Sequence, residues 1–248
     1  MPEASAPDVG TDPPSDAALE DDTGAPSDAT VDAGGEPLPP CGHAGAVFCE
    51  DFESSGTAKW TYMRFSNGTA ERTTERARAG GHSLQANTGA ATSTNNEARY
   101  GARAFDHVMS GDLWLRAFYY VPSSVVAEPG FSTVVIAEIE EPYFGFSLAV
   151  RASRVDIAVG NTMYEGTRAF PRDVWTCVEL HVKIDASAGV FEAFLDGQLA
   201  ARSPATDTLP IMGYTSLDVG IHYTIPPQGS VEVYVDDVVA GTARIGCD

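Results

Sequence analysis

Apolar and polar residues alternate with a period of two along most of the chain that follows its N-terminal part. This period is typical of strands that bury one face and expose the other. In residues 175–185, for example, Leu180 and Val182 alternate with Glu179 and His181. The segments that show this pattern are 113–121, 132–141, 144–150, 175–185, 190–202, 216–225 and 231–241.

The same alternation predicts which side chains face the interior. In the second of these segments it places Val135, Ala137 and Ile139 inward, and Glu138 and Glu140 outward. Asp196-Gly197, in the middle of 190–202, is typical of a tight hairpin turn.

No segment carries the apolar stripe of a three-turn helix, and Gly, Pro and Asp separate the alternating runs. Ten or more strands without helices predict an all-β fold. We expect an antiparallel two-sheet β-sandwich of the jelly-roll kind, with a disordered N-terminal tail.

The N-terminal 40 residues differ from the rest in composition. They hold ten acidic residues, half of the 16 prolines, no Lys or Arg, and no aromatic residue. Such a segment cannot bury enough apolar surface to offset the entropy of ordering it. We therefore predict that 1–40 is a disordered acidic linker rich in Pro, Ala and Asp, and that 41–248 is the folded domain. A solvated spacer is the preferred interpretation, and an acidic interaction tail is the alternative.

The formal net charge of −20 argues against nucleic acid or an anionic membrane as the partner. No apolar stretch is long enough for a transmembrane segment. We expect that a signal peptide or lipoprotein anchor was removed ahead of Met1. The expected location is therefore extracellular, periplasmic or at the cell surface.

Four cysteines, Cys41, Cys49, Cys177 and Cys247, lie near the ends and in the middle of the predicted domain. An even count without a CxxC motif is typical of disulfides in an oxidising compartment. Three pairings are possible. We favour Cys41–Cys49 with Cys177–Cys247, because the first closes a local loop and the second anchors the C-terminus.

Several segments together resemble a known superfamily. In chain order they are FCEDFESSGTAKW, ARAGGHSLQANT, LWLRAFYYVP, DVWTCVELHVKIDASAGVFEAFLDGQLA and VYVDDVVAGTARIGC. The chain resembles the concanavalin A-like lectin/glucanase superfamily, which includes laminin-G-like jelly rolls, over residues 46–246 and in a secreted or lipoprotein-type bacterial form. The resemblance implies the fold but leaves the activity open, because this fold serves glycan binding, hydrolysis and lyase chemistry.

In this superfamily glycans lie on the concave sheet, where aromatic rings stack on sugars and charged groups bind hydroxyls. We expect the outward positions of the strands to form one such face, together with Glu140, Ser147, Arg151 and Asp218. The predicted carbohydrate-binding residues are Arg99, Trp114, Arg116, Tyr120, Glu138, Glu179, His181, Lys183 and His222.

No catalytic residue is favoured. Glu138 and Glu140 loosely resemble the glucanase pattern E-x-D-x-x-E, but the expected third glutamate is absent. The strand motifs of jelly-roll alginate lyases are matched only in fragments, such as Glu97 and Arg99. A lyase also needs a cation and a base. If the protein is an enzyme, the candidates are Glu138, Glu140, His181, His222 and Arg116.

The superfamily resemblance also implies a structural Ca²⁺ between the first and last strands. The matching oxygen ligands are Asp51, Glu53, Asp236 and Asp237. Asp237 shares its phase with the apolar positions of 231–241, so it is expected to point inward and to need a partner. A hydrogen-bond network or Arg244 would serve as well as an ion.

The resulting functional prediction is a secreted or surface-tethered, lectin-like domain that binds a polysaccharide or other glycan. The alternatives are a polysaccharide lyase acting on an acidic glycan by β-elimination, a glycoside hydrolase, and a protein-binding adhesion module. The sequence leaves the identity of the glycan and the oligomeric state open.

Overall fold

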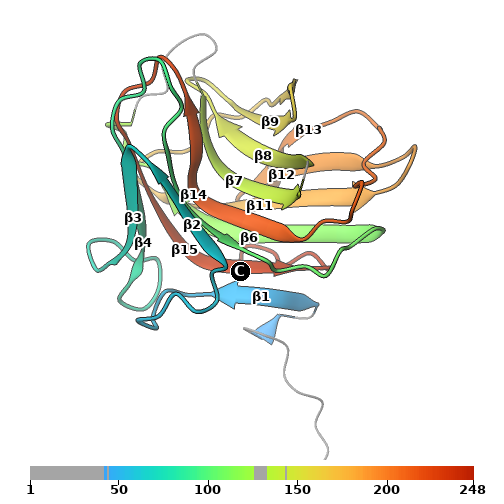
Figure 1. Ribbon diagram of the computed structural model, residues 1–248, viewed down its shortest axis with the longest axis horizontal. Helices are drawn as coiled ribbons and strands as arrows, with labels where there is room; N and C mark the ends of the chain where they lie inside the picture. The colour runs from blue at the N-terminus through green and yellow to red at the C-terminus, as the bar shows by residue number, and fades with distance from the viewer. Residues whose placement is uncertain (1–41, 44, 126–132, 143) are drawn as a thin grey trace, which may run out of the picture. The chain divides into compact units, whose positions relative to one another are not determined.

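The computed structural model describes the whole chain except residues 1–41, 44, 126–132 and 143 (Figure 1). The predicted linker at 1–40 therefore lies outside the described residues. Within them, the structure contains fifteen strands and no α-helix. No helix in the described part is long and apolar enough to cross a membrane. The strands are β1 (Ala46–Glu50), β2 (Tyr62–Ser66), β3 (Gly68–Thr73), β4 (Ser83–Thr88), β5 (Glu97–Ala102), β6 (Gly111–Tyr120), β7 (Thr133–Glu141), β8 (Phe144–Val150), β9 (Val155–Val159), β10 (Thr162–Glu165), β11 (Trp175–Ile184), β12 (Val190–Leu195), β13 (Gln198–Arg202), β14 (Ser216–Ile225) and β15 (Val231–Gly241).

The strands form two antiparallel sheets, which confirms the predicted all-β sandwich. Sheet A has the order β13-β12-β11-β6-β15-β4-β3, and β1 also pairs with β15. Sheet B has the order β10-β9-β8-β7-β14-β5-β2. In Figure 1 the curved strands β14, β7 and β8 of sheet B cross the front, and β6, β11 and β12 of sheet A lie behind them.

The core lies between the sheets and is built from the inward positions of both. On β6 the inward residues are Leu113, Leu115, Ala117 and Tyr119, as the alternation predicts. Burying one side chain the size of Leu, Ile or Phe contributes roughly 1.5–3 kcal/mol. This core fixes which side chains of each sheet point away from the sandwich, and so defines two outer faces.

Two bulges shift the predicted phase. The pairing of β7 with β8 is irregular between Val135 and Ala137, so Ile136, rather than Val135, joins the core. The pairing of β15 with β6 is irregular between Asp236 and Val239. The prediction that Asp237 points inward is therefore wrong. Asp236 is the buried carboxylate, and Asp237 is only half-buried. An extra residue in a strand moves each side chain that follows it to the opposite face of the sheet.

The predicted disulfide between Cys177, on β11, and Cys247 is present, with the two Cα atoms 5.8 Å apart. It ties the end of the chain to the centre of sheet A. Cys49 is also disulfide-bonded. Cys41, its expected partner, lies outside the described residues, so that pairing stays a prediction.

Candidate functional site

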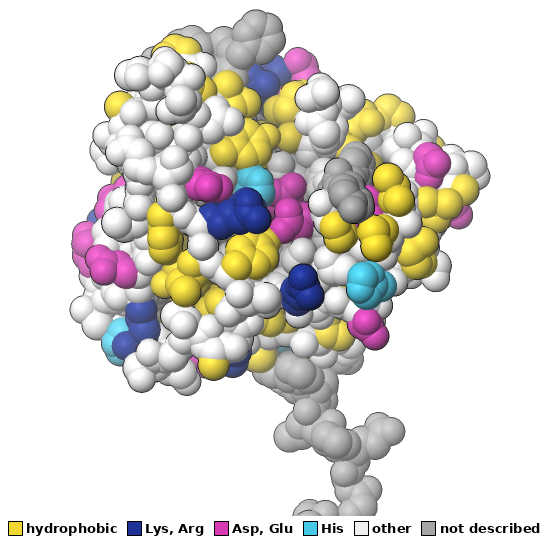
Figure 2. Space-filling view, viewed as in Figure 1, with side chains coloured by type: hydrophobic (Ala, Val, Ile, Leu, Met, Phe, Trp, Pro, Cys, Tyr) yellow, Lys and Arg dark blue, Asp and Glu magenta, His cyan; other side chains and the backbone are white. Residues whose placement is uncertain are grey.

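A connected group of polar side chains lies on the outer face of sheet B. Figure 2 shows basic, acidic and histidine side chains gathered near the centre of this face. Their alternates on the same strands, such as Ala98, Ile139 and Leu217, belong to the core. The group consists of Tyr62 on β2, Arg99 on β5, Glu138 and Glu140 on β7, Ser147 on β8, and Asp218 and His222 on β14.

A bend in β14 assembles this group. Residues four apart on a regular strand are separated by about 13 Å, yet His222 Nδ1 lies 3.1 Å from Asp218 Oδ2. Between Val219 and Tyr223 the strand advances four residues while its partner β7 advances only two. Gly220 makes the bend possible, since its φ is +107° and a Cβ there would lie 2.6 Å from the carbonyl oxygen of Ala98.

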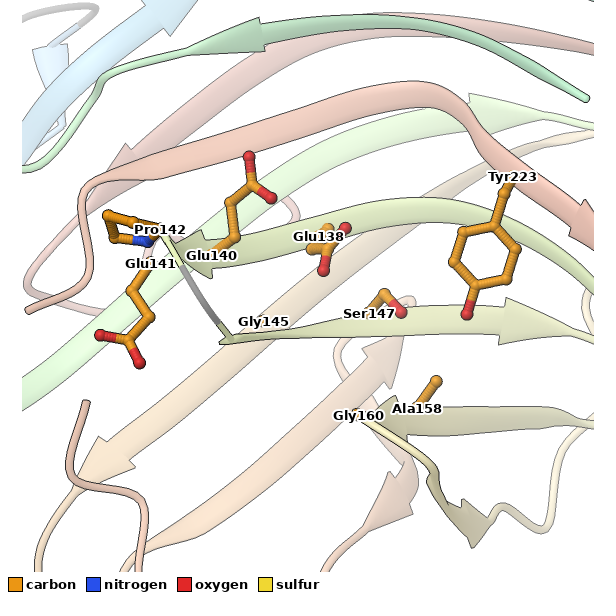
Figure 3. A pocket seen from close by; sticks show the side chains of 9 residues that line it. All are labelled: Glu138, Glu140, Glu141, Pro142, Gly145, Ser147, Ala158, Gly160 and Tyr223. Atoms are coloured by element: carbon orange, nitrogen blue, oxygen red, sulfur yellow. The ribbon is translucent and has the colours of Figure 1, made fainter. Parts of the chain in front are cut away.

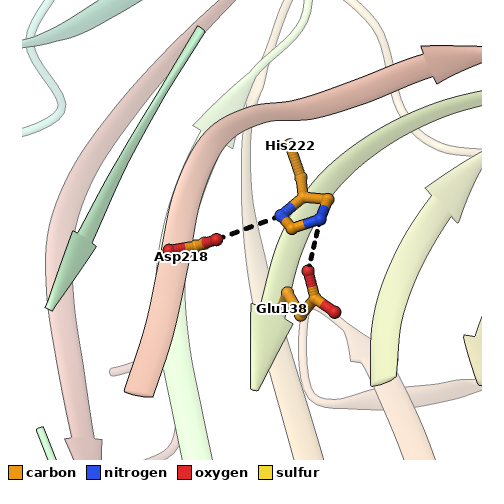
Figure 4. A group of neighbouring side chains, drawn as sticks. All are labelled: Glu138, Asp218 and His222. Atoms are coloured by element: carbon orange, nitrogen blue, oxygen red, sulfur yellow. Dashed lines mark hydrogen bonds and ion pairs between the residues drawn. The ribbon is translucent and has the colours of Figure 1, made fainter. Parts of the chain in front are cut away.

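Asp218, His222 and Glu138 form a chain of ion pairs (Figure 4). His222 Nε2 lies 2.6 Å from Glu138 Oε2, and Arg99 pairs with the fully buried Asp218. Burial lowers the pKa of His222, but hydrogen bonds to Asp218 and Glu138 outweigh it and raise the pKa to about 9. His222 is therefore an imidazolium at neutral pH.

These three side chains are also the one group of metal-ligand type that lies close enough to hold an ion among the residues the structure describes. Here the imidazolium already stands between the two carboxylates, and the guanidinium of Arg99 contacts both the same Asp218 oxygen and the ring of His222. The group is balanced by its own cations, so its geometry does not call for a metal.

Tyr62 connects Asp218 to Glu140. Its hydroxyl lies 2.7 Å from Asp218 Oδ1 and also contacts Glu140 Oε1. One phenolic proton cannot serve two carboxylates at once. Burial and the charge of Asp218 raise the pKa of Glu140. A protonated Glu140 would donate to the Tyr62 oxygen while Tyr62 donates to Asp218. Burial and Asp218 also raise the pKa of Tyr62, so its proton stays in place.

Two glycines leave room for this network to lie flat against the sheet. A Cβ at Gly101 would lie 2.2 Å from the ring of Tyr62 and 2.3 Å from Asp218 Oδ1. A Cβ at Gly145 would lie 2.2 Å from Glu138 Oε1. Any larger residue would displace the side chains that form the floor of the site.

Two adjoining hollows open over this network. The first has a volume of about 350 Å³ and is lined by Glu138, Glu140, Glu141, Pro142, Gly145, Ser147, Ala158, Gly160 and Tyr223 (Figure 3). The second, of about 320 Å³, has Tyr62, Arg64 and Arg103 in its lining. Glu140, Glu141 and Pro142 line both, so the two hollows adjoin, and together they are called the groove below.

The structure divides the predicted carbohydrate-binding residues between two faces. Arg99, Glu138 and His222 meet on sheet B, together with Glu140. The remainder lie on β6 and β11 in sheet A, so the expectation of one shared face is wrong. Alternation along a strand separates inward from outward positions, but it does not reveal which sheet the strand joins. The residues on sheet A are Trp114, Arg116, Tyr120, Glu179, His181 and Lys183.

On sheet A most of these side chains bind other parts of the protein. Glu179 is fully buried and pairs with Arg244, whose Nη2 lies 2.7 Å from Glu179 Oε2. His181 lies between two carboxylates, Asp112 and Glu192, at 2.7 Å from each. Its ring stacks on that of Trp114, with the centroids 4.0 Å apart.

Arg116 and Arg244 also differ from their expected roles. Arg116 is buried, with its Nη2 3.3 Å from His43 Nε2, and burial lowers its pKa. Arg244 pairs with Glu179 on β11, and so does not serve as the partner of Asp237. Glu179, His181 and Arg116 on the outer face of sheet A therefore all have partners within the protein.

The four predicted calcium ligands bind protein groups. Glu53 accepts hydrogen bonds from the amides of Gly81 and His82, each at 2.9 Å. Asp236 accepts from the amide of Arg78 at 2.8 Å, and burial raises its pKa to about 6.

The other two carboxylates have local partners as well. Asp237 pairs with Arg78 at 2.7 Å, and Asp51 accepts from the amide of Glu53 at 3.1 Å. The four do not form a group of three or more ligand atoms in the described part of the chain. Calcium binding at this end of the molecule stays a prediction.

Tyr62 and Tyr223 are among the groove residues that sequence reasoning missed. Tyr62 alternates with exposed Met63 on the edge strand β2, where both faces are largely open and the pattern carries little information. Tyr223 follows the bend in β14, so its facing could not be read from a period of two.

No family model matches the chain, and no curated protein is similar to it in sequence. Its structure is similar to endo-beta-1,4-glucuronan lyase from the fungus Trichoderma reesei, with a TM-score of 0.63 and 14% identity over 80% of this chain and 96% of that one. It is also similar to cellulose induced protein, Cip1, with a TM-score of 0.62 and 17% identity over 81% of this chain and 100% of that one. These likenesses confirm the jelly-roll fold.

Proposed function

We propose that the protein binds carbohydrate in the groove on the outer face of sheet B. The observation that carries this proposal is the 350 Å³ hollow, whose wall holds carboxylates, the hydroxyl of Ser147 and the ring of Tyr223. Sugars present hydroxyls around an apolar ring, so sites that bind them combine hydrogen-bonding groups with an aromatic side chain.

The rigidity of the groove supports the same function. Ion pairs and glycine clearances hold Glu138, His222, Asp218 and Tyr62 in fixed positions before any ligand arrives. A preorganised site loses little conformational entropy on binding. The likeness to a glucuronan lyase adds support at the level of the fold. The disulfide between Cys177 and Cys247 supports an extracellular location. The two-sheet fold supports a place in the concanavalin A-like superfamily.

A glycan array probed with the full chain tests the proposal, followed by affinity electrophoresis on the best polymer. We expect retention that Glu138→Gln and Tyr223→Ala each weaken by about tenfold. Lys183→Ala, on the outer face of sheet A, is the matched control and should leave retention unchanged. No retention on any glycan, together with capture of a protein partner, would support the adhesion module in its place.

A β-eliminating polysaccharide lyase is the second candidate. It is favoured by the cations Arg99 and His222 beside the Tyr62 hydroxyl, since elimination needs a charge to stabilise the enolate and a group that moves a proton. His222 is protonated at neutral pH and Tyr62 keeps its proton, so Tyr62 would donate to the leaving oxygen and the proton acceptor would have to be a carboxylate such as Glu138. Growth of absorbance at 235 nm on incubation with polyuronates would establish this activity, and Tyr62→Phe should abolish it.

A further inference from the structure

The larger hollow of the groove is acidic. Three of its lining residues are Glu138, Glu140 and Glu141, and none of the lining residues that the structure describes is Lys or Arg. No Lys or Arg occurs in the sequence of the residues that the structure does not describe, which are 1–41, 44, 126–132 and 143. Arg64 and Arg103 line the adjoining hollow instead, so the described lining of the larger hollow holds carboxylates without a basic side chain.

Arg99 and His222, the cations that contact this network, do not line the hollow. Arg99 pairs with Asp218 and Glu97, and it is not among the residues that line the hollow. His222 Nε2 binds Glu138 Oε2, which leaves the other oxygen of this carboxylate on the side of Gly145. Because Gly145 lines the hollow, Glu138 presents Oε1 toward the space that a ligand would fill.

The acidic groups around the hollow raise the pKa of two of the residues that line it. Asp218 and Glu138 both raise the pKa of Glu140 through their charge, after the effect of burial. Burial and Glu138 likewise raise the pKa of Tyr223. A bound group with positive charge would relieve this excess, whereas a further carboxylate would add to it.

We propose that the hollow selects a sugar that carries a free amine, an amino sugar, over neutral sugars and uronates. This inference rests on the proposed carbohydrate binding and specifies its ligand class. The ammonium group would lie near Glu138 Oε1, in the hollow between Gly145 and Ser147, where a charge-assisted hydrogen bond can form. The ring hydroxyls would meet Ser147 and Tyr223.

The same charges argue against polyuronates as ligands. A uronate in this hollow would bring its carboxylate close to Glu138, with no basic side chain in the lining to accept it. The net charge of −20 also slows the approach of a polyanion at low ionic strength. The amino group, rather than the ring alone, would decide which glycan is retained.

The test compares three soluble tetrasaccharides by calorimetry or ligand-observed NMR with the unmodified full chain. They are a glucosamine oligomer with free amines, the same oligomer fully N-acetylated, and a glucuronic acid oligomer. We expect the free-amine oligomer to bind at least about tenfold more tightly than the acetylated one. We expect no measurable binding of the uronate.

Matched variants locate the effect. Glu138→Gln/Glu140→Gln should reduce the preference for the free amine to less than about threefold. Glu71→Gln/Glu75→Gln also replaces two carboxyl groups, on β3 and in the loop after it, and should keep the preference intact. This control separates binding in the hollow from attraction to an acidic protein in general.

The possible outcomes distinguish the amino-sugar inference from the proposed carbohydrate binding on which it rests. If the acetylated or uronate oligomer binds as tightly as the free-amine one, the amino-sugar inference is overturned while carbohydrate binding stands. If none of the three binds and the glycan array is empty, carbohydrate binding itself fails. Equal loss of preference in both double variants would also overturn the inference, because the selectivity would then be non-specific.

Discussion

His222 Nδ1 lies 3.1 Å from Asp218 Oδ2, although four residue steps on one strand separate them. The bend at Gly220 produces this contact, and through it the ion-pair chain reaches from Arg99 to Glu138. The polar network of the groove therefore depends on the backbone of β14 as much as on its side chains.

Replacing Gly220 with alanine should disrupt this arrangement. The new Cβ would lie 2.6 Å from the Ala98 carbonyl oxygen at a φ of +107°. We expect a loss of about 2–3 kcal/mol in the free energy of unfolding, measured by urea titration, together with weaker glycan retention. Gly197→Ala is the control, since its φ is +73° with nothing within 4 Å of the Cβ. It should cost about 1 kcal/mol and leave retention unchanged. Equal effects from both would contradict the clash.

The stability of the fold should fall as the pH rises above neutral. His222 has a folded-state pKa of about 9, above its ordinary value of 6.5. Its contribution is therefore complete below pH 6.5 and is lost as the pH rises through about 9. For such a shift the contribution is on the order of 3 kcal/mol.

His222→Gln provides the comparison for this pH dependence. The difference in unfolding free energy between the wild type and His222→Gln should be largest at pH 6 and shrink toward pH 9.5. A difference that stays constant over this range would show that His222 does not gain a proton on folding.

Removing the hydroxyl of Tyr62 should destabilise the protein through the two carboxyl groups that it joins. Tyr62→Phe leaves Asp218 and Glu140 without the bridging group between them, and we expect a loss of about 1–3 kcal/mol. Adding Glu140→Gln to Tyr62→Phe should cost less than the sum of the two single changes, because the residues are coupled. Tyr164→Phe, on β10, serves as the control. Additive losses would argue against this coupling.

The outer face of sheet A should be needed for stability but not for binding. Arg244→Ala would leave Glu179 buried without its guanidinium partner, at a cost of roughly 2–4 kcal/mol. The pair of exposed Arg202 with Glu192 provides the comparison, since Glu192 keeps its contact with His181 and Arg202→Ala should cost under about 1 kcal/mol. Both variants should retain glycan as well as the wild type does below their unfolding temperatures. Loss of binding in Arg244→Ala would move the site to sheet A.

The period of two predicted the class of fold, most strand positions and the inward residues of β6 and β11. It could not predict the two bulges or the bend at Gly220, because each depends on contacts with a neighbouring strand rather than on the local sequence. For the same reason, the sequence could not show that the predicted carbohydrate-binding residues lie on two different sheets. Glu138 and His181 are equivalent in pattern, and only the pairing of their strands places them on opposite sides of the molecule.

A protonated Glu140 that donates to the Tyr62 oxygen would have a consequence for any cationic ligand of the groove. An ammonium group bound beside Glu140 would favour the ionised carboxylate, so binding would release a proton to the solvent. The heat measured on binding would then vary with the ionisation enthalpy of the buffer. Titrations in phosphate and in Tris would differ by the heat of that one proton, and the affinity would rise with pH for as long as the ligand keeps its own charge.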